Sequence, residues 1–169
     1  MANFKSRIWE LDALRGVCIL CVIVVHFLFD LSFFGGLDLT LPAWYVFLQE
    51  YGGAIFVVLS GVCVTLGSKS VRRGLIVFAC GMLITAVTYG MYRLGMSGMD
   101  VVVKFGVLHL LGVCMLVYPA FKKLPPATLT VLGLVIAITG YAIRGIIVPQ
   151  RWLFPLGLTY EGFTSSDYF

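Results

Sequence analysis

The chain has 169 residues, of which 60% are hydrophobic and only 12% are charged, and its mean hydropathy is +1.02. A soluble domain carries about 25% charged residues, so this composition excludes a soluble globular protein and indicates several membrane-spanning helices. The formal net charge of +4 comes from short basic segments between apolar runs. No basic patch interleaved with aromatic residues indicates binding to nucleic acid.

Five apolar runs are expected to cross the membrane as helices. They are expected at about residues 11–34, 51–67, 75–94, 101–121 and 127–148. Gly35-Gly36 is expected to end the first run, and the aromatic residues 44–47 are expected at the membrane interface before the second. We therefore expect an all-α, polytopic integral membrane helix bundle that forms a single transmembrane domain over residues 1–169.

The positions of the cations orient these spans, because cytoplasmic segments of membrane proteins hold an excess of Lys and Arg. With the N-terminus in the cytoplasm, eight of the twelve cations fall on the inner side: Lys5, Arg7, Arg15, Lys69, Arg72, Arg73, Lys122 and Lys123. The N-terminus is therefore expected to be cytoplasmic. Five spans leave the other end outside, and this odd number, with the ending Asp167-Tyr168-Phe169, indicates that the natural chain continues beyond Phe169.

The first expected span contains four ionisable residues, Asp12, Arg15, His26 and Asp30. At about 100° per residue, Arg15 and His26 lie about 20° apart around the helix axis, and the two aspartates lie about 60° to the same side. We call these four residues the ionisable stripe. Such groups at membrane depth are costly and normally face a protein interior or a water-filled cavity, so the stripe indicates a functional surface.

The outer half of the stripe holds a candidate general base. Asp30 follows His26 by four residues, which places a carboxylate within reach of an imidazole whose basicity it would raise. The alternative is a polar clamp between packed helices. His109, in the early turns of the fourth expected span, is expected at similar depth, either as a further catalytic residue or as a buried histidine whose hydrogen bonds are satisfied.

The inner half of the stripe suits an anionic ligand. Arg15, about 16 Å from His26 along the helix, could hold the phosphates of a long donor, with Asp12 beside it and Arg73 from the next basic segment. The alternative for the arginines is that they only anchor the cytoplasmic side. A coenzyme A thioester has the required shape, because a charged nucleotide head carries a long neutral arm.

The same stripe allows two other interpretations. A small proton-coupled transporter or permease would use Asp12, Arg15, His26 and Asp30 as a relay. No internal repeat is visible, although transporters often contain inverted repeats. A scaffold subunit would use the stripe only for helix packing.

The five cysteines lie inside apolar runs, and no His/Cys set has zinc spacing, so we expect no metal site.

Residues 7–16, with the sequence RIWELDALRG, resemble the opening signature of the membrane acyltransferases that include heparan-alpha-glucosaminide N-acetyltransferase, and in particular of their small bacterial relatives. The spacing from Arg15 to His26 is also similar to the first-helix motif of bacterial membrane O-acyltransferases. Further matching motifs are FVVLSG at residues 56–61, Arg73-Gly74, FGVLH at residues 105–109 and DYF at residues 167–169.

The resemblance implies that acetyl-CoA or another acyl-CoA binds from the cytoplasm and that the acyl group passes to a glycan or cell-envelope acceptor on the other side. It implies a donor-binding role for Arg15 and places His26 nearest the thioester. Heparan-alpha-glucosaminide N-acetyltransferase, a lysosomal enzyme, has its proposed catalytic histidine in the loop after the first span. The corresponding loop of this chain, residues 35–42, contains no histidine, so His26 would take that role here. The expected location is a bacterial cytoplasmic membrane. The sequence leaves open whether the chain forms a homo-oligomer.

Overall fold

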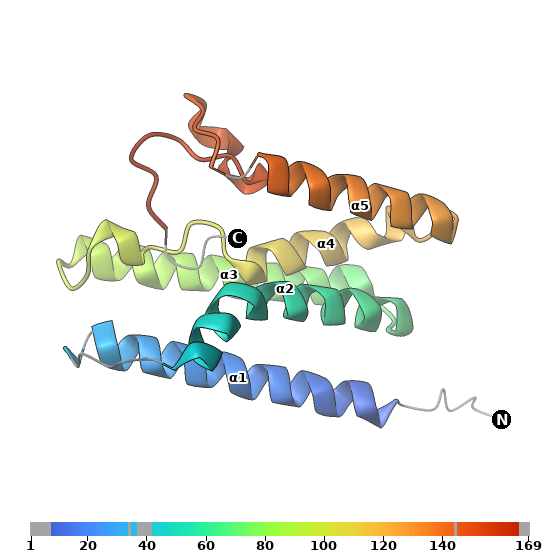
Figure 1. The fold of residues 1–169 in the computed structure, drawn as a ribbon, viewed down its shortest axis with the longest axis horizontal. Coiled ribbons are helices and arrows are strands. Elements are labelled where there is room, and N and C mark those ends of the chain that lie inside the picture. The colour runs from blue at the N-terminus through green and yellow to red at the C-terminus, as the bar shows by residue number, and fades with distance from the viewer. Residues whose placement is uncertain (1–7, 34, 37–41, 144, 166–169) are drawn as a thin grey trace. The chain divides into compact units, whose positions relative to one another are not determined.

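The computed structural model describes residues 8–33, 35–36, 42–143 and 145–165. Within them the chain is helical, no β-strand occurs, and an isolated parallel bridge joins Ile147 to Thr159 (Figure 1). The elements are α1 Trp9–Phe33, α2 Ala43–Leu66, α3 Ser70–Arg93, η1 Met99–Val101, α4 Val107–Phe121, α5 Pro126–Ala142 and η2 Arg151–Leu156, where η marks a 3-10 helix. The predicted all-α class is confirmed.

Three helices are long and apolar enough to cross a bilayer. They contribute candidate spans of 24 residues each, Trp9–Ser32, Ala43–Leu66 and Ser70–Arg93. The apolar helices α4 and α5 have 15 and 17 residues and are therefore only roughly 22–26 Å long. The first three predicted spans are thus confirmed as helices that can cross a membrane, whereas crossing by α4 and α5 stays a prediction.

The chain forms two compact units, Met1–Leu66 and Gly67–Phe169. In the first unit α1 packs against α2, and Tyr45, near the start of α2, is only 2% exposed. The expected start of the second span at residue 51 is wrong, because α2 begins at Ala43. Pro42 stands immediately before the first helical residue, and its carbonyl accepts the N–H of Tyr45 at 2.9 Å, so the aromatic segment is already helical.

The fourth predicted span also begins too early. Residues 101–106 were expected to be helical, but Val102 and Gly106 have extended backbones and α4 begins only at Val107. The β-branched residues Val102 and Val103, which follow η1, favour the extended form, and side chains of α3 satisfy the backbone of Val103. The fifth predicted span is too long, because α5 ends at Ala142 and residues 146–148 pair with Thr159.

Some sequence predictions fall outside the described residues. They concern the expected cytoplasmic cations Lys5 and Arg7, most of the loop after α1 and the motif Asp167-Tyr168-Phe169. The predicted break at Gly35-Gly36 is described and is confirmed. α1 ends at Phe33, the N–H of Gly35 bonds to the carbonyl of Asp30 at 3.4 Å, and Gly36 has a φ of +62°.

In the second unit α3 and α4 lie side by side along most of α4 (Figure 1). Two glycines permit this close approach. A Cβ on Gly112 would lie 2.7 Å from the Cβ and 2.8 Å from the Cα of Phe78, and a Cβ on Gly81 would lie 3.1 Å from the ring of His109. Glycine at these two positions therefore lets the ring of His109 and the backbone of α4 pack directly on α3.

Candidate functional site

The ionisable stripe lies on one unbroken helix. α1 runs from Trp9 to Phe33 without interruption and therefore contains Asp12, Arg15, His26 and Asp30. The predicted geometry follows, with Arg15 and His26 about 20° apart around the axis and about 16 Å apart along it. The helix α1 alone therefore positions all four residues of the stripe.

At the N-terminal end of the stripe, Arg15 and Asp12 form a loose ion pair. Nη1 of Arg15 lies 3.9 Å from Oδ1 of Asp12, and the two side chains are 40% and 52% exposed. At this separation and exposure the pair contributes little to stability. Asp12 nevertheless lies in the first turn of α1, where the helix dipole favours a carboxylate. The guanidinium of Arg15 thus remains accessible to an anionic ligand.

At the C-terminal end of the stripe, His26 and Asp30 are both exposed within the first unit. Among the described residues, no hydrogen bond or ion pair joins these two side chains. The structure therefore brings them to one face of α1, one helical turn apart, but not into contact. Orientation of the imidazole by Asp30 stays a prediction.

Arg73 and His109 belong to the second unit. Arg73 lies in the first turns of α3, is exposed, and its backbone N–H bonds to the carbonyl of Lys69 at 3.2 Å. We predicted that Arg73 lies near Arg15 and that His109 lies near His26, and both stay predictions.

His109 is a buried polar residue with only 2% of its surface exposed. Its ring stacks on Phe105 at 5.4 Å between centroids and meets the ring of Phe78 edge-on at 5.7 Å. The backbone N–H of Gly106 donates a hydrogen bond to Nδ1 at 3.2 Å, and Nε2 lies 3.3 Å from the hydroxyl oxygen of Thr85. Both ring nitrogens therefore have partners within the protein.

These contacts determine the tautomer of His109. Because Nδ1 accepts a hydrogen bond from an N–H, the proton of a neutral ring must reside on Nε2. The Nε2–H group then donates to Thr85, whose own hydroxyl donates to the carbonyl of Val103 at 2.8 Å. This arrangement is that of a satisfied buried histidine. A catalytic role as a base would require the bond from Gly106 to open.

A second threonine completes the attachment of the extended segment to α3. The hydroxyl oxygen of Thr88 accepts the backbone N–H of Val103 at 3.2 Å, and its proton is directed to carbonyls within α3. Thr85 and Thr88 together satisfy both backbone groups of Val103, and we call the pair the threonine clamp. The clamp explains why the chain at Val103 bonds to α3 rather than continuing α4 towards its N-terminus.

A row of aromatic side chains connects His109 to the segment after α5. Phe105, which stacks on His109, meets Phe154 at 6.4 Å, and Phe154 lies 5.9 Å from Phe163. Phe163 in turn meets the ring of Tyr160 edge-on at 5.1 Å. The row fixes η2 and residues 160–163 against the connection between α3 and α4.

Lys104 and Ser165 strengthen the same attachment. The backbone N–H of Lys104 donates to the hydroxyl of Ser165 at 3.0 Å, and that hydroxyl donates to the carbonyl of Val102 at 3.1 Å. Nζ of Lys104 lies 4.7 Å from the centroid of the Phe163 ring and 3.5 Å from the hydroxyl of Tyr160. The residues after α5 therefore lie at the end of the second unit where α3 ends and α4 begins.

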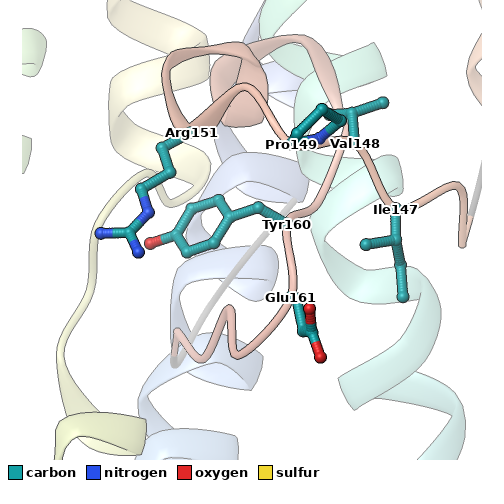
Figure 2. Close-up of a pocket in the computed structure, with 6 residues that line it drawn as sticks. All are labelled: Ile147, Val148, Pro149, Arg151, Tyr160 and Glu161. Atoms are coloured by element: carbon teal, nitrogen blue, oxygen red, sulfur yellow. The ribbon is translucent and has the colours of Figure 1, made fainter.

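A cavity of about 510 Å³ opens beside Tyr160 (Figure 2). It is lined by Ile147, Val148, Pro149, Arg151, Tyr160 and Glu161. The N–H of Val148 bonds to the carbonyl of Thr159 at 2.8 Å, and this pairing holds the two walls of the cavity together.

Two features of the second unit were not predicted as functional. Thr85 and Thr88 were visible in the sequence only as polar residues within an apolar helix, and their common partner Val103 lies 18 and 15 residues further along the chain, respectively. Arg151, Tyr160 and Glu161 carried no motif, and they come together only because Ile147 pairs with Thr159.

Comparison with known proteins gives one match. No curated protein and no solved structure is similar enough to the chain to be matched. The profile of the family described as "Heparan-alpha-glucosaminide N-acetyltransferase, catalytic" matches residues 7–169. The matched region contains all five helices, the ionisable stripe and the segment after α5. The chain therefore belongs to the heparan-alpha-glucosaminide N-acetyltransferase catalytic family, a family of membrane acetyltransferases.

Proposed function

We propose that this protein moves an acetyl group from cytoplasmic acetyl-CoA to a glycan or cell-envelope acceptor on the opposite side of the membrane. The observation that carries the proposal is the unbroken α1, which holds an accessible Arg15 and, eleven residues later on the same face, His26. Membership of an acetyltransferase family supplies the reaction class.

The inner end of the stripe suits the donor's phosphates. Among the described residues, the ion pair of Arg15 is the loose 3.9 Å contact with Asp12, so its guanidinium can present a pair of N–H groups to a phosphate. Asp12 would orient that guanidinium, and Arg73 at the start of α3 would add a second cation. The pantetheine arm would then follow α1 towards His26.

The distribution of charge in the second unit supports the proposed sidedness. The beginning of α3 and the turn after α4 hold five cations and no carboxylate among their described residues: Lys69, Arg72, Arg73, Lys122 and Lys123. The opposite end, fixed by the contacts of Lys104 with Ser165, holds cations together with Asp100 and Glu161. An excess of cations favours the cytoplasmic side, so the first end would be inner and the second outer.

The chemical step needs a base near the thioester. His26 would accept the proton of the acceptor's hydroxyl or amine while the acceptor atom forms its bond to the acyl carbon. The bond from that carbon to sulfur breaks, and the coenzyme A thiolate takes up the proton from the imidazolium. In the covalent variant, His26 first carries the acyl group and then transfers it. Asp30 would stabilise the imidazolium in either route.

The test is acetyl-CoA binding to the detergent-solubilised protein, measured by isothermal titration calorimetry. Arg15→Ala should weaken binding about 10- to 100-fold, because it removes charge-assisted hydrogen bonds to phosphate. Arg93→Ala, which removes the same charge from the last turn of α3, serves as the matched control and should bind like the parent. No binding by a folded parent protein, together with substrate uptake driven by a pH gradient, would instead identify a proton-coupled transporter.

A further inference from the structure

Two cations and a hydroxyl meet at one end of the Tyr160 ring. Nζ of Lys104 lies 3.5 Å from the Tyr160 hydroxyl and donates to it, and the guanidinium of Arg151 lies beside the same end of the ring (Figure 2). The guanidinium carbon is 5.6 Å from the ring centroid. Because the hydroxyl oxygen accepts from Lys104, its proton remains to be donated, and no described residue accepts it. Three donor groups therefore face the same region.

The two positive charges are not neutralised by a nearby carboxylate. Among the described residues neither Lys104 nor Arg151 forms an ion pair, and Figure 2 shows the carboxylate of Glu161 directed away from the guanidinium. Lys104 is half-buried, so its ammonium has lost part of its hydration. Like charges repel each other, and a partly desolvated cation is costly unless it is paired. An anion bound beside the Tyr160 hydroxyl would reduce both costs.

The position of Lys104 along α3 places this pair of cations within reach of membrane phosphates. Lys104 follows Val103, whose backbone is bound by Thr85 and Thr88 in the last three turns of α3. The 24 residues of α3 can cross a bilayer and are roughly 36 Å long, so the end of the helix lies near the lipid headgroups.

An apolar surface begins inside the cavity and continues outside it. Ile147, Val148 and Pro149 form the apolar part of the lining, and Ile147 is 66% exposed. In η2, directly after Arg151, the side chains of Trp152 and Leu156 are 72% and 67% exposed. Acyl chains would cover such side chains, and tryptophan is typical of the membrane interface. A soluble phosphate compound would use the three donors but leave this surface uncovered, so the surface favours a lipid.

We propose that Lys104, Arg151 and Tyr160 form a phosphate-binding site for an anionic phospholipid of the surrounding membrane. The phosphate accepts hydrogen bonds from the three side chains, the glycerol part occupies the cavity of about 510 Å³, and the acyl chains lie over Ile147. The bound lipid would join the connection between α3 and α4, which contains Lys104, to the segment after α5, which contains Arg151. The proposal does not depend on acetyl transfer.

The experiment is native mass spectrometry of the full chain in detergent, titrated with dioleoylphosphatidylglycerol and, separately, with dioleoylphosphatidylcholine. Phosphatidylglycerol should bind several times more tightly, because the choline group would bring a third cation to the site. Arg151→Gln and Lys104→Gln should each weaken its binding about tenfold, since each removes a charge-assisted hydrogen bond to phosphate. Equal affinity for the two lipids, or unchanged affinity in both variants, would overturn the proposal.

Two controls test whether the effect is local and independent of folding. Arg93→Gln removes the same charge from an exposed residue in the last turn of α3, outside the cavity, and should bind phosphatidylglycerol like the parent. Equal weakening by this variant would show that only general surface charge attracts the lipid, and the site would be wrong. Arg151 is exposed, so Arg151→Gln should unfold at the parent's temperature without lipid. Phosphatidylglycerol should raise that temperature more in the parent than in Arg151→Gln.

Two further titrations identify the source of the phosphate. Inorganic phosphate carries the anion without acyl chains, and binding as tight as that of phosphatidylglycerol would assign the site to a soluble phosphate compound and exclude the lipid. Acetyl-CoA should bind Lys104→Gln and Arg151→Gln like the parent, whereas a loss of its affinity would place the donor's phosphates here and overturn the lipid site. If no protein binds acetyl-CoA while phosphatidylglycerol binding depends on Lys104 and Arg151, the lipid site stands and the acetyltransferase proposal fails.

Discussion

Thr85 and His109 share one hydrogen bond, and the same hydroxyl of α3 also binds the chain before α4. The hydroxyl oxygen of Thr85 lies 3.3 Å from Nε2 of His109 and donates to the carbonyl of Val103 at 2.8 Å. A single hydroxyl therefore links a helix, an extended segment and a ring that is 2% exposed.

Thr85→Val should destabilise the protein by about 1–2 kcal/mol, because it leaves Nε2–H of His109 and the carbonyl of Val103 without this partner. Thermal unfolding in detergent measures the change. Thr65→Val is the matched control, since the hydroxyl of Thr65 is exposed and bonds to the carbonyl of Val62 within the same helix. A loss of stability no greater than that of the control would contradict the role of Thr85.

Gly112→Ala should destabilise the second unit by about 1–3 kcal/mol, because the new methyl group would overlap Phe78 on α3. Gly133→Ala provides the control on α5, where no atom lies within 4 Å of the added carbon. That substitution should be neutral or stabilising by up to about 1 kcal/mol, since alanine has the higher helix propensity. The difference in unfolding temperature between the two variants tests the packing of α3 on α4.

His26→Ala should reduce the transfer of a radiolabelled acetyl group from acetyl-CoA by about 10²-fold or more, with little change in unfolding temperature. The reason is that His26 is exposed within its unit. Full transfer activity in this variant would exclude His26 as base or acyl carrier.

His109→Ala should lower the unfolding temperature, since it removes partners from Thr85 and Gly106. His109→Asn places an amide oxygen where it can accept the N–H of Gly106, so it should recover part of that stability. If transfer activity recovers with stability, His109 acts through the fold. If His109→Asn is stable and inactive, His109 takes part in the chemistry.

Arg15→Lys should bind acetyl-CoA more weakly than the parent but more tightly than Arg15→Ala. Lysine keeps the positive charge, whereas it cannot form the paired hydrogen bonds of a guanidinium to phosphate. Calorimetric titration of the three proteins in one buffer gives the order directly. Equal affinity of the lysine and alanine variants would show that charge at residue 15 does not attract the donor.

The sequence predicted the elements whose determinants are local. α1 was located nearly to the residue, because its apolar run is continuous and Gly35-Gly36 follows it directly. The ionisable stripe followed from that helix alone. The start of α2 was missed because the aromatic segment was assigned to the interface, although Pro42 marks the beginning of a helix.

The features that were missed depend on contacts between distant residues. Val101 to Val103 read as the start of an apolar span, but the backbone of Val103 bonds to Thr85 and Thr88 on another helix. The cavity beside Tyr160 likewise depends on the pairing of Ile147 with Thr159 across the turn that contains η2. No pattern within a single segment encodes either arrangement.

The hydrogen bonds of Ser165 have a consequence for biosynthesis. Ser165 bonds to Lys104 and Val102, which precede it by 61 and 63 residues, whereas the packing of α3 on α4 involves segments that emerge soon after one another. Contacts between distant residues form late, because the intervening chain must first be synthesised and its ends brought together. During translation the α3–α4 pair should therefore assemble first, and the end of the segment after α5 should attach to it only after residue 165 has left the ribosome.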